Sequence, residues 1–278
     1  MGGRERALAS WLSVAPEPTS APICTIKALD TPEELIASFR LRYDVYAALG
    51  YVRHLNGRRL EIDEYDLSAM PFGAFDTTSG EMVGTLRLIT TEPQAAHEPL
   101  VRDVVGELGD LDLIEQAFST PRHPLPSIIS EELAGQIQRF NSDQLPVREL
   151  SRTIVRPGHR GSGVSRGLME LGLACASRLA PSVLVGACLP QHVPMYARYG
   201  YVPLARNGLD HFDSVGQAAN AVVCRTDDLP EPTRSHVDDL RSAMAAGAAD
   251  HTLEIGHESR AVVRFAGPRR SRRSTREW

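Results

Sequence analysis

Runs of apolar residues, set apart by polar turns, predict a series of strands along the chain. The clearest run is residues 183–188 (VLVGAC), which is typical of a strand buried on both faces. A polar turn at residues 77–80 separates two apolar segments, which favours a hairpin. With the two hairpin strands included, the other expected strands are residues 23–29, 73–76, 82–90, 149–155, 201–204 and 218–225.

Helical periodicity appears between these strands. The first helix is expected to begin at a cap formed by Asp30 or Thr31 and to end near Gly50. Glu33 and Glu34 lie in its first turn, where the helix dipole favours acids. The other expected helices are residues 100–108, 131–140, 165–179, 193–199 and 230–249. Because strands and helices alternate, we expect an α/β (α+β) fold with a mixed sheet flanked by helices.

Composition divides the chain into four parts. Residues 1–22 are expected to be a peripheral segment that ends in a Pro-rich linker, and residues 23–226 carry the alternating elements of the main domain. Residues 227–266 begin with a Pro-rich entry, continue as an Ala-rich helix and are expected to form a C-terminal extension. Residues 267–278 are basic and almost without apolar side chains, so we expect a disordered tail.

Charge and cysteine content restrict the class of protein. A net charge of -5 argues against nucleic-acid binding through overall charge. The four cysteines lack the spacing of metal ligands or redox pairs, and loop histidines such as His54, His97 and His123 have no partners at metal-binding spacing, so we expect no metal site. The sequence has neither an apolar signal core nor the run of about 20 apolar residues that a membrane span needs. We therefore expect a cytoplasmic protein.

Residues 149–168 (ELSRTIVRPGHRGSGVSRGL) form the segment on which the functional interpretation depends. A predicted strand passes through a Pro-Gly turn and enters a helix at a glycine-rich sequence. The first N–H groups of a helix have no partner within it and favour anions, and glycine lets the main chain approach a ligand closely. We therefore expect this turn to bind the phosphate of an acyl carrier's arm. The residues assigned to this site are Val155, Arg160, Gly161, Ser162, Gly163, Val164 and Ser165.

The glycine-rich sequence also carries a family resemblance. It resembles the acyl-carrier loop of the GNAT N-acyltransferases, Gln/Arg-x-x-Gly-x-Gly/Ala, with Ser165 as the last small residue. A longer series within about residues 30–205 is similar to the acyl-homoserine-lactone (autoinducer) synthases. That series is Arg42, Tyr46, Gly50-Tyr51, Glu61-x-Asp63-x-x-Asp66, Arg87 and Glu149-x-x-Arg152. Tyr51 in place of Trp, and a fuller Arg-Gly-x-Gly loop, make the chain more similar to the related long-chain N-acyl amino acid synthases.

This resemblance implies a GNAT-like twisted sheet and transfer of an acyl group, expected to be long, to an amine. The donor would be a thioester of acyl carrier protein (acyl-ACP) or of coenzyme A (acyl-CoA), with no tightly bound cofactor. The acceptor would be an amino acid, a related amine or a peptide. Two alternatives stay open: an acyl-homoserine-lactone synthase that uses S-adenosylmethionine, and a non-catalytic acyl-carrier-binding module. Acetyl transfer also stays open, because the sequence does not define pocket depth.

The chemistry of amide formation assigns roles to a few residues. An amine that attacks a thioester must lose a proton, and we expect Glu149 to accept it, directly or through water. Main-chain N–H groups at residues 153–155 are expected to stabilise the oxyanion. Tyr196 resembles the tyrosine that many GNAT enzymes place before a Gly-aromatic pair, which implies an acid for the leaving thiolate. Tyr196 would otherwise be a core residue. Glu149 would otherwise be a structural partner of Arg152 or Arg87.

The remaining charged and aromatic residues of the series are expected to organise the substrate pocket. They are Arg42, Tyr46, Asp63, Asp66, Arg87 and Arg152. Because a lone carboxylate in an apolar site is costly, the five charged residues could form one ion-pair network that pins the acidic loop (residues 61–66) to the sheet and touches no substrate. We favour this interpretation for Arg42, Asp63 and Asp66. His192, just after the last buried strand, would be either a base or a capping residue, and we favour the capping residue.

Two further segments have expected roles in binding. Residues 92–146 are expected to shape the acyl site because of their position in the chain. The tail carries five arginines, and a solvated tail is favoured over the hypothesis that it attracts an acidic acyl carrier protein. The arginines are Arg269, Arg270, Arg272, Arg273 and Arg276. The expected partners are thus an acyl carrier and an amine, without nucleic acid or membrane.

Overall fold

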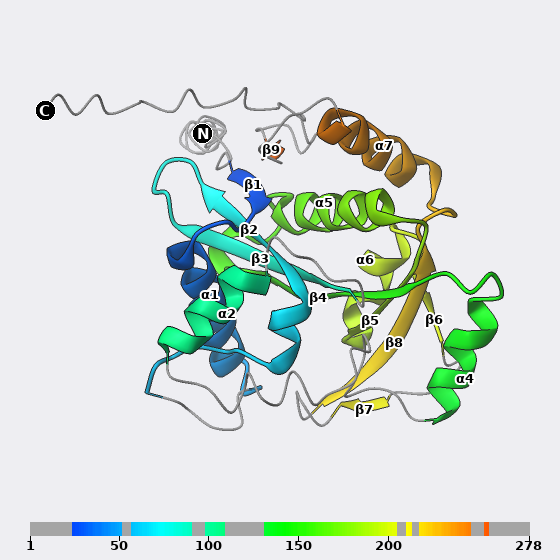
Figure 1. Ribbon diagram of the computed structural model, residues 1–278, viewed down its shortest axis with the longest axis horizontal. Helices are drawn as coiled ribbons and strands as arrows, with labels where there is room; N and C mark the ends of the chain where they lie inside the picture. Colours follow the sequence, from blue (N-terminus) through cyan, green and yellow to red (C-terminus); the bar gives the residue numbers. More distant parts are fainter. Residues whose placement is uncertain are drawn as a thin grey trace, which may run out of the picture.

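A mixed β-sheet forms the centre of the protein (Figure 1). The computed structural model describes residues 24–51, 57–90, 98–108, 131–204, 210–212, 217–245 and 253–255. Its strands are β1 (Cys24–Ala28), β2 (Ala69–Asp76), β3 (Met82–Ile89), β4 (Val147–Val155), β5 (Val183–Cys188), β6 (Val202–Pro203), β7 (Asp210–Phe212), β8 (Gln217–Arg225) and β9 (Leu253–Ile255). They are ordered β6-β8-β5-β4-β3-β2-β1-β9, with β7 paired to β8. Only β4 and β5 pair in parallel within this described sheet.

Helices cover both faces of the sheet, which confirms the predicted α/β fold. The α-helices of the described residues are α1 (Pro32–Ala48), α2 (Glu98–Glu107), α4 (Glu131–Phe140), α5 (Val164–Leu179), α6 (Val193–Ala197) and α7 (Glu231–Ala245). The 3-10 helices in the same ranges are η1 (Glu64–Ser68), η2 (Pro157–His159) and η3 (Pro190–His192). Helices α1 and α2 lie on one face, whereas α5 lies on the other face beneath α7 (Figure 1).

The start of α1 follows the local chemistry that the sequence predicts. Of the two candidate caps, Thr31 is the cap, because its side chain accepts a hydrogen bond of 3.3 Å from the main chain of Glu34. Glu33 and Glu34 occupy the first turn, where they complement the dipole. The helix is tied to β3 by a hydrogen bond of 2.6 Å between the Ser38 and Thr85 hydroxyl groups. The cap and this tie fix where the polar face of α1 meets the sheet.

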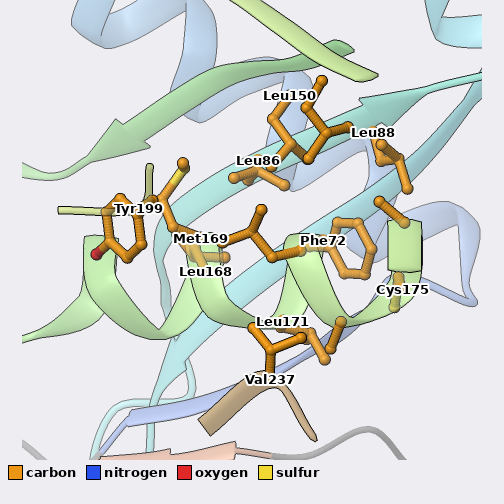
Figure 2. Packing of buried hydrophobic residues seen from close by; sticks show 14 of the residues in the cluster. Phe72, Leu86, Leu88, Leu150, Leu168, Met169, Leu171, Cys175, Tyr199 and Val237 are labelled. Atoms are coloured by element: carbon orange, nitrogen blue, oxygen red, sulfur yellow. The ribbon is translucent and has the colours of Figure 1, made fainter. Parts of the chain in front are cut away.

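The main core lies between the sheet and α5 (Figure 2). Leu86, Leu88 and Leu150 project from the sheet onto Leu168 and neighbouring residues of α5, and Val237 of α7 packs from the other side. A Cβ atom at Gly172 would come within 2.9 Å of the Leu150 side chain, so glycine is what lets α5 approach the central strands. The start of α5 is therefore held at a fixed place relative to β4.

Some element boundaries differ from the sequence predictions. Strand β5 has the predicted bounds, but β2 begins four residues before the predicted start at Gly73. Strand β7 and strand β9, which pairs with β1, were not predicted. The predicted strand at 201–204 and the predicted helix at 193–199 are each shorter, as β6 and α6. The expectations for residues 1–22 and 267–278 fall outside the described residues.

The two parallel strands at the centre of the sheet part from each other. Strand β4 pairs with β5 only over Val147–Glu149, opposite Val183–Val185. Beyond this point β4 continues alongside β3, while β5 continues alongside β8. The sheet therefore loses a ladder of hydrogen bonds at its centre, directly after Glu149.

Candidate active site

Glu149 lies at the point where the strands part. It is the last β4 residue paired with β5, and it is 7% exposed. Its neighbours Arg148 and Leu150 face α5: Arg148 donates to the carbonyl groups of Ala176 and Ala180, and Leu150 packs on the helix. Because side chains alternate along a strand, Glu149 faces the opposite side, which α1 covers. The predicted base is thus a buried carboxylate on the α1 face.

A β-bulge follows Glu149 within the same strand. Thr85 pairs with Ile154 and Arg87 pairs with Ser151, so the single residue Leu86 faces two residues of β4, Arg152 and Thr153. Arg152 has a φ of 55°, in the left-handed region that non-glycine residues rarely adopt. Such a conformation costs of order 1–3 kcal/mol and persists when its surroundings enforce it. A bulge also removes a residue from the ladder. The irregularity thus lies at the start of the segment expected to supply oxyanion donors.

Three arginines and three carboxylates form a connected network on this face. Each arginine bridges two of the carboxylates. Arg42 donates to Glu61 and to Asp66, at 2.7 and 3.0 Å for the latter. Arg87 donates to Asp66 at 2.9 Å and to Asp63 at 2.8 Å, and Arg152 donates to Glu61 at 3.0 Å and to Asp63 at 2.8 Å. The formal charges of these six groups cancel. The favoured sequence interpretation, an ion-pair network joining the acidic loop to the sheet, agrees with these contacts.

The acidic loop contributes through both its side chains and its main chain. Asp63 caps η1 by accepting from the Tyr65 N–H, and Asp66 accepts from the Asp63 N–H. Burial alone would raise the pKa of both carboxyls, but the neighbouring guanidinium groups outweigh it and lower both values. Glu61 belongs to the series of residues that carries the family resemblance, although the sequence alone does not assign it to the site. Its position just before Asp63 and Asp66 in the same acidic segment is the feature that indicates a third carboxylate.

Aromatic rings pack against this network. The ring centroid of Tyr46 lies 5.6 Å from the Arg152 guanidinium carbon, and the Tyr51 ring lies 5.9 Å from that of Tyr46. Burial raises the pKa of Tyr46, against the opposing charge of Arg152. Tyr46 therefore packs as a neutral ring against the arginine, and Tyr51 packs against Tyr46 in turn.

Tyr196 approaches the parting strands from the α5 side. It is 6% exposed, belongs to the core cluster around α5, and makes an edge contact with Tyr201 at a centroid distance of 5.3 Å. Burial raises its pKa strongly, the charges of Cys188 and Glu149 add to this shift, and a hydrogen bond with Thr153 opposes it. Tyr196 is thus a protonated phenol near the bulge. It is also a core residue, as the alternative interpretation describes, and its role as an acid stays a prediction.

The turn before α5 is built from main chain. Gly161 has a φ of 80° and Gly163, the N-cap residue of α5, has a φ of 91°; both angles favour glycine. Ser162 Oγ donates to the His159 carbonyl at 2.6 Å, and Arg160 Nε donates to the Val155 carbonyl at 3.3 Å. A Cβ atom at Gly161 would have nothing within 4 Å. Side chains therefore brace the turn and leave its surface open.

The first N–H groups of α5 are available for a ligand. The first main-chain bond of the helix runs from Gly167 to Gly163, at 3.0 Å. In the described part of the chain, the N–H groups of residues 161–166 have no recorded acceptor, and no side chain caps this end. Val164 is buried against β3 near Gly84, so only its main chain can contribute. His192 lies near enough to Arg160 for that charge, after burial, to lower its pKa. This end of α5 is suited to an anion.

Two kinds of site are missing from the described residues. They contain no group of three or more His, Cys, Asp or Glu side chains placed to hold a metal ion. None of their helices has the length and apolar character that crossing a bilayer requires.

Known proteins resemble this chain in sequence or in structure only distantly. A search of curated proteins gives no match. Among solved structures, FeeM, an N-acyl amino acid synthase from uncultured soil microbes, is 20% identical with a TM-score of 0.48, covering 77% of this chain and 95% of that chain. The CoA-dependent acyl-homoserine lactone synthase BjaI is 18% identical with a TM-score of 0.47, covering 79% and 90%. Residues 41–170, from the charged network to the glycine turn, match the family model "Acetyltransferase (GNAT) domain". This part of the chain is therefore similar to GNAT acetyltransferase domains.

Proposed function

We propose that this protein is an N-acyltransferase that moves an acyl group, expected to be long, from a thioester of acyl carrier protein or coenzyme A to the amine of an amino acid, a related amine or a peptide. One observation carries the proposal. A buried carboxylate, Glu149, and a β-bulge lie together where β4 and β5 part, on the strand that leads to the open end of α5. A general base, main-chain donors for the oxyanion and an anion-binding helix end thus lie on one continuous segment, which runs from β4 to the start of α5.

The donor would bind along β4. Its phosphate would be held by the N–H groups of residues 161–166, helped by the positive charge of Arg160. The arm would then extend beside β4 toward Glu149, in the gap that β5 leaves open. This placement brings the thioester carbonyl to the bulge at Arg152 and Thr153, where main-chain N–H groups stabilise the oxyanion of the tetrahedral intermediate.

The acceptor amine would reach the thioester from the α1 face. Glu149 takes a proton from the amine as the nitrogen attacks the thioester carbon. Collapse of the intermediate forms the amide C–N bond and breaks the C–S bond, and the electron pair leaves with sulfur. Tyr196 then donates its phenolic proton to the thiolate from the α5 side. Its raised pKa keeps the phenol protonated before this step, although it also makes the phenol a weaker acid. The carboxyl proton of Glu149 and the phenolate then re-equilibrate with solvent.

The charged network would shape the acceptor side of the site. It is neutral overall, so it can hold the acidic loop beside Glu149 without presenting a net charge. Helix α4 covers β5 next to this region, since Ile137 packs in one cluster with Val183 and Val185. Residues 92–146, which include α2 and α4, are proposed to line the acyl chain.

Product mass distinguishes the candidate reactions. The protein is incubated with acyl-ACP or acyl-CoA of several chain lengths, together with an amino-acid pool or with S-adenosylmethionine. We expect an acyl amino acid whose mass changes with the acyl group. An acyl-homoserine lactone formed only with S-adenosylmethionine would instead support the second candidate, which the order of the charged residues favours. Absence of any acylated product with either pool would contradict acyl transfer to these amines.

Replacing the proposed base separates an enzyme from a binding module. Glu149→Gln should lower kcat by roughly a hundredfold or more, because the amide cannot accept the amine proton, while acyl-carrier binding stays unchanged. Glu81→Gln is the matched control, since this carboxylate is exposed at the β2–β3 turn. An unchanged rate in Glu149→Gln would make Glu149 a structural residue. A wild-type protein that binds the carrier without turnover would indicate a non-catalytic module.

A further inference from the structure

We infer that Arg152 is a positioning residue whose side chain locks the β4 bulge, so that the charged network acts on the thioester through the backbone. This inference rests on the proposed acyl transfer. The network would enforce a left-handed residue within the strand, and that residue would aim main-chain N–H groups at the developing oxyanion. Arg152 would then matter for the shape of β4 and not for contact with a substrate.

The conformation of Arg152 is the first observation. Its φ of 55° lies in the left-handed region, which glycine adopts without steric strain and in which Asn and Asp are the commonest other residues. The sequence places a long cationic side chain there, at a two-against-one bulge opposite Leu86. A residue in such a conformation has to be held by its surroundings. The question is therefore what holds it.

The side-chain contacts of Arg152 supply the restraint. Nε donates to Glu61 at 3.0 Å, Nη2 donates to Asp63 at 2.8 Å, and the Tyr46 ring lies against the guanidinium. These two carboxylates belong to the acidic loop, more than 80 residues away in sequence. The planar guanidinium spans both at once, which a single point charge does not do.

The anchors are themselves fixed. Arg42 also donates to Glu61, and Arg87 also donates to Asp63, so neither carboxylate can follow Arg152 if the bulge relaxes. Arg87 Nε donates to Ser151 Oγ at 3.0 Å, which holds the residue before the bulge from the same side. The bulge directs the side chains of both Ser151 and Arg152 to the network, whereas Thr153 approaches Met169 of α5. The restraint therefore acts at the bulge itself.

Two substitutions at position 152 test the lock against direct substrate contact. Both Arg152→Ala and Arg152→Gly remove the side chain, but only glycine can keep a φ of 55° without strain. If the Arg152 side chain acts by holding the backbone, kcat should fall on the order of 10²–10³-fold in Arg152→Ala, as when oxyanion donors are lost. The kcat of Arg152→Gly should then be at least about tenfold higher than that of Arg152→Ala. KM for the acyl donor should stay unchanged in both. Equal kcat values for the two variants would overturn the inference.

A matched control comes from Gln144, which has the same φ of 55° in an exposed turn before β4. Gln144→Gly should raise the melting temperature slightly and Gln144→Ala should leave it nearly unchanged, and neither should alter kcat. The two Gln144 variants measure how much a glycine at a left-handed position changes stability when no catalytic role is involved. A glycine advantage in kcat that also appeared at position 144 would be a stability effect and would overturn the lock.

A third variant decides the question if either substitution at position 152 prevents folding. Arg152→Lys keeps the charge balance but cannot hold Glu61 and Asp63 in the same forked geometry. It should lower kcat and leave donor KM unchanged, and a Lys variant as active as the wild type would overturn the inference. Failure of the proposed function looks different, because the wild type itself would then acylate no amine.

Discussion

The two ends of the proposed site are built in opposite ways. On the α1 face, six charged side chains from α1, the acidic loop, β3 and β4 pair with one another. At the start of α5, the site consists of main-chain N–H groups presented by a turn with left-handed Gly161 and Gly163. The first region is closed by its own partners. The second is open because it lacks side chains that would fill it.

This difference predicts how each end responds to substitution. In the network every charge is balanced by another, so removing one group leaves a buried charge behind and the whole protein loses stability. At the turn no charged group is buried, so a substitution changes the direction of N–H groups and mainly alters donor binding. Substitutions in the network should therefore lower the free energy of unfolding, whereas substitutions in the turn should raise the KM for the acyl donor.

The largest expected effect is on stability, from Arg87→Met. Arg87 is 4% exposed and bridges Asp63 and Asp66, so its loss leaves both carboxylates with fewer cationic partners inside the protein. We expect a loss of about 3–5 kcal/mol in the free energy of unfolding, measured with urea at neutral pH. The control is Arg241→Met, which removes an exposed ion pair with Asp238 and should change the stability by less than about 0.5 kcal/mol. Similar losses in the two variants would show that the network is not coupled to folding.

Low pH should destabilise the charged network without any substitution. The pKa values of Asp63 and Asp66 are lowered in the folded protein, so the unfolded chain binds protons more readily as the pH falls. The stability that these groups contribute is complete above their unfolded pKa, near 4, and is lost as the pH falls further. Urea unfolding between pH 6 and pH 3 should reveal a loss of about 1–3 kcal/mol, because each lowered carboxyl contributes about 1 kcal/mol over this range. In Asp66→Asn the acid-dependent part should shrink, and an unchanged slope would contradict this assignment.

At the turn, Gly161→Ala should act on donor binding. Its φ of 80° disfavours any side chain, although a Cβ atom would meet nothing within 4 Å, so the effect is one of backbone conformation alone. Donor KM should rise about tenfold with little change in kcat. The control is Gly106→Ala in α2, where a Cβ atom is equally free of contacts and the backbone is helical, and where stability should increase slightly. A fall in kcat at constant KM would place the turn away from the donor.

The elements that could be predicted from the sequence are those with local causes. Thr31 caps α1 because a hydroxyl can accept from an N–H three residues on. Strand β5 has its predicted bounds because its apolar run begins after Ser182 and ends just before the Leu189-Pro190 pair, where proline cannot continue the ladder. The glycines of the turn could be assigned for the same reason. Pairing between the arginines and aspartates was also predictable in kind, since buried charges require partners.

What the sequence did not reveal depends on contacts between distant segments. The bulge has no local signal, because Arg152 stands where glycine would be the usual sign, and its conformation is explained only by Glu61 and Asp63. Strand β9 is three residues long and is defined by pairing with β1 at the other end of the chain. Which carboxylate meets which arginine was likewise undetermined until the loop was placed. Chemistry was therefore easier to predict than the geometry that supports it.

The smallest expected effect tests whether side chains brace the open turn. Asp76, at the end of β2, accepts from the Thr78 and Ser79 N–H groups with Oδ1, and its Oδ2 lies 3.3 Å from His159 Nε2. Since the His159 carbonyl accepts from Ser162, Asp76 is linked to the turn through one histidine. Asp76→Asn keeps an acceptor for the hairpin but presents an amide to the imidazole.

Donor KM in Asp76→Asn should rise about threefold at constant kcat, because the turn loses one brace while its glycines remain. Ser79→Ala is the control, because it removes the hydroxyl that contacts Asp76 and leaves His159 untouched; its donor KM should match the wild type. A rise in both variants would assign the effect to the hairpin. A rise in neither would mean that Gly161 and Gly163 alone set the direction of the N–H groups, which would make the contrast with the side-chain network complete.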